Sequence, residues 1–159
     1  PLARLRHLPV LHELVGHDTL ADNTHTEVAA WVVGAAMLLP RQAFAAVGGF
    51  DSRFHMNSEE VDLQLRLRQL GLPSVVLSQP TLVHAGGGSS ASDKRRQWLV
   101  DSRFIYADKW HGPSGVKRLR ATLKTASYIN FAWNLTRQAR GVDVAARERL
   151  ATELAFLPA

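Results

Sequence analysis

The spacing of apolar residues along the chain predicts a succession of short helices and strands. Between Glu59 and Gly71, three leucines recur at i, i+4 and i+7, which predicts a helix with one buried face. These leucines are Leu63, Leu67 and Leu70. Ser58 offers an N-terminal cap, and Gly71 with Pro73 after it ends the helix. We therefore expect a helix with a charged tip and a buried stem.

The remaining elements follow from the same kind of pattern. The apolar stretch 27–40 contains Val and Trp, which favours a buried strand, and 41–47 reads as a short helix before Gly48. Two short strands are expected at 74–78 and 81–84. Further helices are expected before Gly16 and at 93–110, 116–140 and 143–157, with Gly112 and Pro113 ending the helix that starts at Asp93.

The composition is that of an ordinary globular protein. The 159 residues are 46% hydrophobic and 21% charged, which is enough for one domain with a core. No cysteine is present, which excludes disulfides and thiolate metal sites and permits a reducing cytoplasm. No signal peptide and no run of about 18 apolar residues occurs, so the chain is expected neither to be exported nor to span a membrane.

Positive charge is concentrated in one predicted helix. The chain carries a net charge of +5, whereas residues 116–140 alone contribute +6, with aromatic and aliphatic side chains between the charges. The basic residues are Lys117, Arg118, Arg120, Lys124, Arg137 and Arg140. Such a helix fits an anionic membrane surface, and equally an ordinary helix that packs its apolar face on the domain. A nucleic acid polymer is not expected, because no recognition signature accompanies the charge.

Three carboxylates crowd the first turn of the helix that begins at Glu59. Acidic residues at a helix N-terminus complement the dipole, and Asp62 can pair with Arg66 one turn later. Glu59, Glu60 and Asp62 together exceed what a dipole requires, because neighbouring like charges oppose ionisation. The spacing alone leaves a structural role and a catalytic role both open.

Two other places could contact a ligand. Trp31 lies beside Gly34 and Ala35, where small residues let a ligand approach the backbone closely, although simple core packing also fits. His84 ends a predicted strand directly before the glycine-rich loop 86–90, a place suited to a metal or a phosphate.

Five sequence pieces in order resemble the inverting family 2 glycosyltransferases of the GT-A fold, especially rhamnosyltransferase-like and galactofuranosyltransferase-like members. The pieces are W-x-x-G-A-x-M-L at 31–38, G-G-F-D-x-x-F at 48–54, E-E-x-D-L-x-x-R-x-R-x-x-G at 59–71, a histidine followed by glycines at 82–88, and S-R-F-x-Y-x-x-K at 102–109. The resemblance covers about half of the chain. It implies an α/β fold, namely the C-terminal half of a GT-A (Rossmann-like) domain at 1–112, followed by a basic helical tail at 113–159.

The resemblance implies roles for the acidic tip. In this family the second carboxylate of the pair is the general base, which here is Glu60, where Asp is more common. The base takes the proton of an acceptor hydroxyl while that oxygen attacks the anomeric carbon, opposite a nucleoside diphosphate leaving group. Glu59 would orient the acceptor, and Asp62 would brace the helix through Arg66.

The resemblance also implies a substrate and metal site. His84 matches a ligand of a divalent metal, Mn or Mg, which would neutralise the departing diphosphate. Arg103 and Lys109 would contact the diphosphate. The sugar and the acceptor would lie against Trp31, Gly34, Ala35 and Asp51.

The family's nucleotide-binding half, which ends in an Asp-x-Asp motif, has no counterpart before Trp31. The chain starts with Pro1 instead of Met, and we expect a preceding half or a second chain to complete the donor site. The expected partners are a nucleotide-sugar donor and a cell-envelope glycan or lipid-linked acceptor, in the cytoplasm at the inner membrane face. The alternative is a noncatalytic module that binds glycan or membrane.

Overall fold

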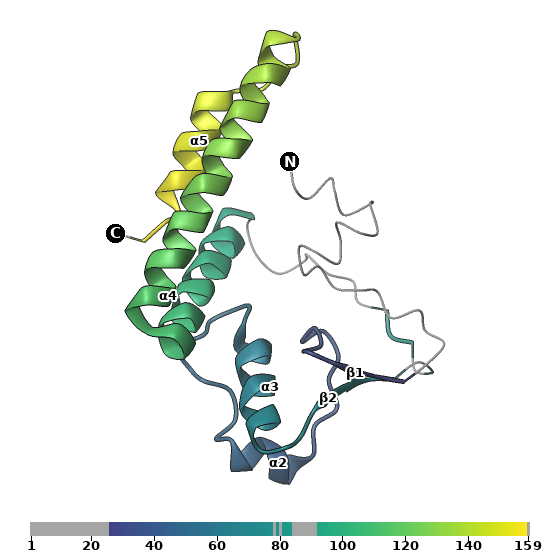
Figure 1. Cartoon of the computed structure of the whole chain (residues 1–159). Helices are drawn as coiled ribbons and strands as arrows, with labels where there is room; N and C mark the ends of the chain where they lie inside the picture. The colour runs from purple at the N-terminus through teal and green to yellow at the C-terminus, as the bar shows by residue number, and fades with distance from the viewer. Residues whose placement is uncertain (1–25, 78, 80, 84–91, 159) are drawn as a thin grey trace. The chain divides into compact units, whose positions relative to one another are not determined.

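The computed structural model describes residues 26–77, 79, 81–83 and 92–158 (Figure 1). The helix predicted before Gly16 and most of the loop around His84 lie outside these residues. The described residues form two compact units that divide at Trp110. One unit contains residues 26–109 and the other residues 110–158.

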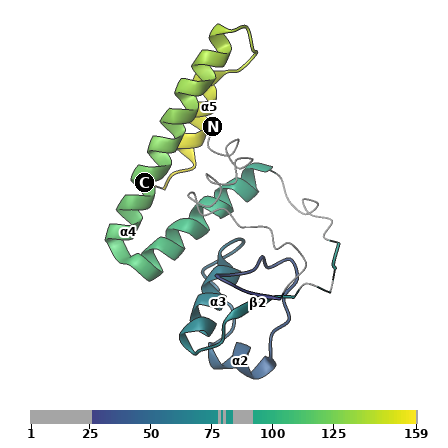
Figure 2. The same ribbon diagram turned by 45° about the vertical axis from the view of Figure 1, so that its right-hand side comes forward.

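The first unit contains a two-stranded sheet and two short helices. Strand β1 (Glu27–Ala29) pairs antiparallel with β2 (Ser74–Val76), so that Val28 lies opposite Val75. Helix α2 (Arg41–Ala46) and helix α3 (Glu59–Gln69) follow β1, and both strands lie beside α3 in Figures 1 and 2. The helices match the predicted segments closely.

The strand predictions were too long. Only Glu27–Ala29 of the expected strand 27–40 is extended in the sheet, because residues 30–39 turn away to run beside α3. Residues 81–83 form no strand, and β2 ends at Val76. The β-branched content of these stretches is real, but no neighbouring strand is present among the described residues to extend the ladder.

Helix α3 has the buried stem that the leucine spacing predicted. Leu63 and Leu67 are buried, whereas Leu70 is 57% exposed at the end of the helix. Gly71 has a φ of 79°, the left-handed conformation that ends many helices. The predicted cap by Ser58 is wrong. Ser58 itself has a φ of 67° and its side chain caps nothing, since a capping serine needs extended backbone.

Helix α4 (Ser92–Ala139) belongs to both units and is interrupted where the sequence predicted an end. Gly112 has non-helical dihedral angles (φ 60°, ψ −162°), and Pro113 follows it. Proline cannot supply an amide to the preceding turn, but it is well suited to the first turn of a new helix. The chain therefore forms a new helical segment from Pro113 to Ala139.

The second unit is a helical hairpin. After Gly141, which has a φ of 77°, the chain turns back into helix α5 (Ala146–Ala155), which lies alongside the second segment of α4 (Figures 1 and 2). Val144 and Ala146 are buried in the turn, and the Arg120 guanidinium donates to the carbonyl of Pro158. Within the described residues, no helix combines the length and apolar character needed to cross a membrane.

Candidate active site

The side chain of Glu60 lies against the backbone of Gly34 in the first unit. A Cβ built on Gly34 would lie 3.3 Å from the Cβ of Glu60 and 3.7 Å from its carboxyl carbon. The loop therefore approaches the Cβ of Glu60 more closely than an alanine at position 34 would comfortably allow. The structure thus brings together Gly34 and Glu60, two residues that the sequence placed separately at the predicted site.

The environment of Glu60 makes its carboxylate more basic. Burial raises its pKa above the usual 4.5, and the charge of Glu59 acts in the same direction. Hydrogen bonds from the backbone amides of Glu60, Gly34 and Val61 partly oppose this increase.

One oxygen of each glutamate has no donor. Oε2 of Glu59 and Oε2 of Glu60 are both buried, and neither accepts a hydrogen bond from the described part of the chain. A buried acceptor left unpaired costs free energy, which a donor that reached it would recover. The tip of α3 therefore presents two neighbouring carboxylates with unused capacity to accept hydrogen bonds.

Asp62 differs from its two acidic neighbours. Its side chain is completely buried, and its two oxygens lie 2.8 Å from Arg66 Nη2 and 2.7 Å from Lys109 Nζ. The predicted pairing with Arg66 is therefore confirmed. Arg66 also donates to the carbonyl of Val47 at the end of α2. Asp62 thus stabilises the packing of α3 and is not available to a substrate.

Asp51 and Lys109, both predicted to bind substrate, contact each other. Lys109 Nζ lies 2.8 Å from Asp51 Oδ2, and the Arg53 guanidinium lies 2.7 Å from the same oxygen. Arg53 first, and Lys109 second, hold the pKa of Asp51 well below its usual range. Lys109 thus joins the turn at Asp51 to the buried Asp62, and its ammonium group is occupied by protein carboxylates.

Tyr106 lies one turn before Lys109 on the same helix. Burial raises the pKa of its phenol, and the negative charge of Asp62 adds to the increase.

The hydroxyl of the buried Ser102, on the same helix, donates to the carbonyl of Met56 at 2.7 Å. The first segment of α4 is therefore joined to the 51–58 turn at two positions, Ser102 and Lys109.

Gln64 positions the Gly34 loop, and the sequence analysis did not single it out. Its Oε1 accepts from the Val32 amide at 2.7 Å and from the Ser74 hydroxyl at 2.7 Å, while its Nε2 donates to the Val32 carbonyl at 2.8 Å. The side-chain amide thus pairs with the loop as a strand would. The only sign of this role in the sequence is a glutamine on the apolar face of the predicted helix, since a buried polar side chain needs hydrogen-bond partners.

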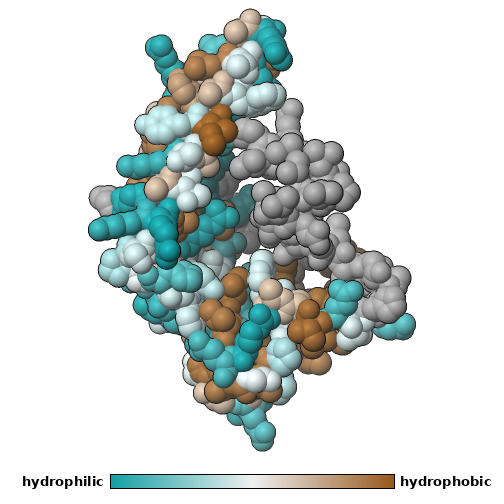
Figure 3. All heavy atoms as spheres, viewed as in Figure 1, coloured by the Kyte–Doolittle hydropathy of each residue, from teal (hydrophilic) through white to brown (hydrophobic). Residues whose placement is uncertain are grey.

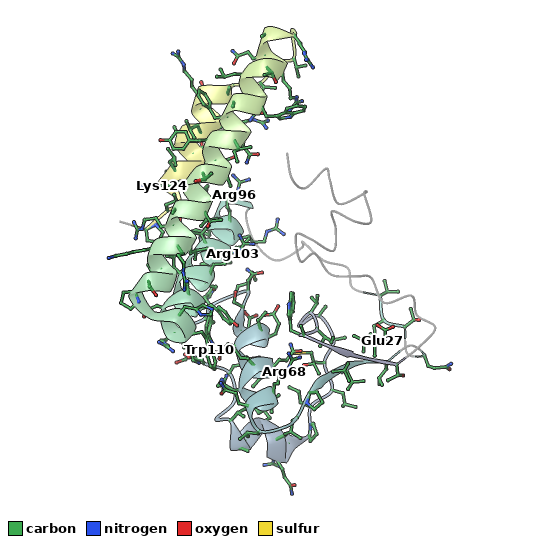
Figure 4. All side chains as sticks on the ribbon, in the orientation of Figure 1. Glu27, Arg68, Arg96, Arg103, Trp110 and Lys124 are labelled. Atoms are coloured by element: carbon green, nitrogen blue, oxygen red, sulfur yellow. The ribbon has the colours of Figure 1, made fainter. Side chains whose placement is uncertain are left out.

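Arg68 provides a second connection between α3 and the chain before Gly34. Its guanidinium donates to the carbonyls of Ala29 and Ala30, at the end of β1 (Figure 4). Together with Gln64, this arginine fixes the path of residues 29–32 along α3. The Gly34 contact with Glu60 follows from these two anchors.

The other predicted site residues are placed as follows. Trp31 is half-buried, and Gly34 and Ala35 are exposed on the same loop. Arg103, labelled in Figure 4, is exposed on α4. The diphosphate contact predicted for it stays a prediction. His84 lies outside the described residues.

The described residues do not build a metal site by themselves. Nowhere in them do three metal-binding side chains of the His, Asp and Glu type come together. The carboxylate of Asp62 is committed to two cations, and the Glu59 and Glu60 pair offers only two side chains. The divalent metal expected from the sequence stays a prediction, since its expected ligand His84 lies outside the described residues.

A comparison with curated proteins found relatives of this chain. The chain is 32% identical over 117 residues to the N-acetylglucosaminyl-diphospho-decaprenol L-rhamnosyltransferase of Mycobacterium tuberculosis, in strains CDC 1551 and H37Rv. This match covers 69% of the chain and 38% of the relative. The resemblance to rhamnosyltransferase-like glycosyltransferases is confirmed. The chain is also 35% identical over 97 residues to the O-antigen biosynthesis protein RfbC of Myxococcus xanthus. This match covers 57% of the chain and 7% of RfbC.

These matches limit what the chain shares with its relatives. The chain spans less than two fifths of the rhamnosyltransferase and a small part of RfbC. No family model matches the sequence. No solved structure matches it either, and the mixed α/β architecture described above is compatible with part of a GT-A domain without establishing that fold.

Proposed function

We propose that this chain is the acceptor side of an inverting, nucleotide-sugar-dependent glycosyltransferase of family 2, with Glu60 as the general base. The observation that carries the proposal is the environment of Glu60: a half-buried carboxylate of raised pKa, at the start of α3, directly beside the Gly34 backbone. The relationship to a rhamnosyltransferase supports the reaction class.

The reaction needs a base that is ionised at neutral pH and close enough to a hydroxyl to remove its proton. The Glu60 carboxylate accepts the proton of the acceptor hydroxyl, and that oxygen forms the new bond to the anomeric carbon. The bond from that carbon to the nucleoside diphosphate breaks, and the diphosphate leaves with the electron pair. A raised pKa makes Glu60 a stronger base than an exposed glutamate.

The neighbouring residues have supporting roles in this proposal. Oε2 of Glu59 would accept a hydrogen bond from a second hydroxyl of the sugar acceptor and so orient that acceptor. Asp62, held by Arg66 and Lys109, keeps the first turn of α3 in place. The half-buried ring of Trp31 and the exposed Gly34 and Ala35 would contact the acceptor sugar.

The acceptor is proposed to be a cell-envelope glycan or a lipid-linked sugar. The mycobacterial relative is named for N-acetylglucosaminyl-diphospho-decaprenol, a lipid-linked sugar, and RfbC is named for O-antigen biosynthesis. The donor nucleotide, and the divalent metal that would accompany it, are proposed to bind to residues beyond the described ones. His84 is the candidate ligand that this chain would contribute.

The test compares Glu60→Gln with Glu59→Gln in the protein expressed from its complete reading frame. Turnover of a nucleotide-sugar donor onto a lipid-linked acceptor is measured, and folding is checked by circular dichroism. Glu60→Gln should reduce kcat by about a thousandfold, within the range expected for removing a general base, whereas Glu59→Gln should mainly raise KM for the acceptor.

The pH dependence provides a second readout. Because the base must be ionised, kcat/KM should fall as the pH is lowered through the raised pKa of Glu60, at a higher pH than an unshifted glutamate would give. A Glu60→Gln enzyme with unimpaired turnover would exclude this residue as the base. An acidic limb that persists in the residual activity of that variant would do the same.

A further inference from the structure

The second segment of α4 exposes large apolar side chains beside positive charge. Tyr128 is 55% exposed, Ile129 47% and Trp133 41%. Lys117, Arg118 and Lys124 are exposed on the preceding turns of the same helix. We call these six residues the basic–aromatic face.

The opposite side of the segment is the packed one. Leu119 and Leu123 are partly buried, and Ser127 and Asn134 are buried. Residues 127 and 134 lie seven positions apart, and Leu119 and Leu123 fall on the same side of the helix at a period of 3.6. The apolar residues of the basic–aromatic face therefore lie outside the packed interior of the helical hairpin. One side of this helix therefore packs in the hairpin, and another side remains exposed.

Charge and apolar character are arranged along the helix. With a rise of 1.5 Å per residue, the face runs about 24 Å from Lys117 to Trp133, with lysine and arginine in its first half and aromatic and aliphatic side chains in its second. No acidic residue occurs between Pro113 and Arg140. Figure 3 shows hydrophilic and hydrophobic side chains intermingled over α4 and α5.

We propose that the basic–aromatic face docks on an anionic membrane surface. Lysine and arginine would meet the phosphate groups of the lipids, and Tyr128 and Trp133 would enter the zone between headgroups and acyl chains, where amphipathic rings are favoured. Docking of a second copy through the same face is opposed by its own charge, since three basic residues would meet three others. A membrane supplies both the negative charge and the apolar depth.

This inference concerns binding and does not depend on the proposed catalytic role of Glu60. It would bring the protein to a surface on which a lipid-linked acceptor is confined. The two proposals fail separately, because vesicle binding is measured without a donor and turnover on a soluble acceptor analogue is measured without a membrane.

The test is co-sedimentation of the purified protein with two kinds of vesicle, one of phosphatidylcholine alone and one of phosphatidylcholine and phosphatidylglycerol in equal parts. Binding to the mixed vesicles should be stronger and should weaken as salt is added. The double variant Lys117→Gln/Lys124→Gln should bind them about 25-fold less tightly, at about fivefold for each charge removed. Trp133→Ala should weaken binding to both kinds of vesicle.

The matched control is Arg41→Gln/Arg149→Gln, which removes the same charge from exposed positions on α2 and α5 and should leave vesicle binding near that of the wild type. Unchanged helix content by circular dichroism shows that all variants fold. Equal binding to both kinds of vesicle, or equal losses in the control and in the lysine variant, would overturn the proposal. The proposal would also be overturned if the wild type did not bind vesicles and instead formed an oligomer that Trp133→Ala dissociates. The face would then be a contact between protein molecules.

Discussion

The ammonium group of Lys109 lies 2.7 Å from Oδ1 of Asp62, a carboxylate with no exposed surface. The same ammonium group lies 2.8 Å from Asp51, so one lysine on α4 connects the first turn of α3 to the turn that precedes it. A buried charge that loses one of its partners is strongly destabilising, since the remaining partner must compensate its desolvation alone. This geometry places Lys109 among the residues that hold the candidate site together.

Lys109→Met should therefore destabilise the protein by about 3 kcal/mol, because the buried Asp62 and the turn residue Asp51 would each lose a cation. Urea unfolding followed by circular dichroism measures the change. Lys94→Met makes the same substitution at an exposed position of the same helix and should change the stability by less than about 0.5 kcal/mol. Equal effects of the two substitutions would contradict the structural role of Lys109.

Gly34→Ala should impair catalysis more than folding. The new methyl group would lie 3.3 Å from the Cβ of Glu60, so either the loop or the carboxylate must move by a few tenths of an ångström. A displaced base loses alignment with its hydroxyl, and we expect kcat to fall about tenfold with little change in Tm. Ala36→Ser adds one atom to an exposed position of the same loop and should leave kcat unchanged. A Gly34→Ala enzyme with the wild-type kcat would show that this contact does not position Glu60.

Glu60→Gln should make the folded protein more stable at neutral pH. The pKa of Glu60 is raised in the folded state above its usual 4.5, so the folded protein binds this proton more tightly than the unfolded chain does. Stability therefore falls as the pH rises through the interval between the two values, and the amide, which never ionises, avoids the loss. Thermal unfolding at several pH values should show a higher Tm for the variant near neutrality. The difference should shrink in acid, and a less stable variant at neutral pH would contradict the assigned environment.

Gln64→Glu should release the loop that carries Gly34. A carboxylate cannot donate to the Val32 carbonyl, and a negative charge would be buried beside it, so we expect a loss of about 2 kcal/mol. Gln69→Glu makes the same change at an exposed position on α3 and should be nearly neutral. The comparison of their midpoints of urea unfolding tests whether the buried amide is needed.

The periodic elements were predictable from the sequence, and the contacts between distant residues were not. The spacing of the leucines located α3 to within a residue or two, and Gly112 with Pro113 marked the interruption of α4, because both features depend on local chemistry. The length of the strand predicted at 27–40 was overestimated. β-propensity reflects packing beside a neighbouring strand, and within this stretch only Glu27–Ala29 pairs with one.

The candidate site was predictable as a set of residues but not as a set of contacts. The acidic tip of α3 drew attention through its charge density, and the family resemblance singled out Glu60. Neither could show that Asp51 and Lys109 pair with each other, because their contact joins a turn to a distant helix. Gln64 was missed for the same reason, since its partners are backbone atoms, which no side-chain pattern encodes.

The way Gln64 holds the loop has a consequence for how this site can change. It binds the amide and carbonyl of Val32, which are backbone groups, and the side chain of Val33 is 58% exposed. The exposed side chains of Val33, Ala35 and Ala36 can therefore be exchanged without removing the hydrogen bonds between Gln64 and Val32. If the loop contacts the acceptor as proposed, these positions are where acceptor recognition can be varied while Glu60 keeps its place.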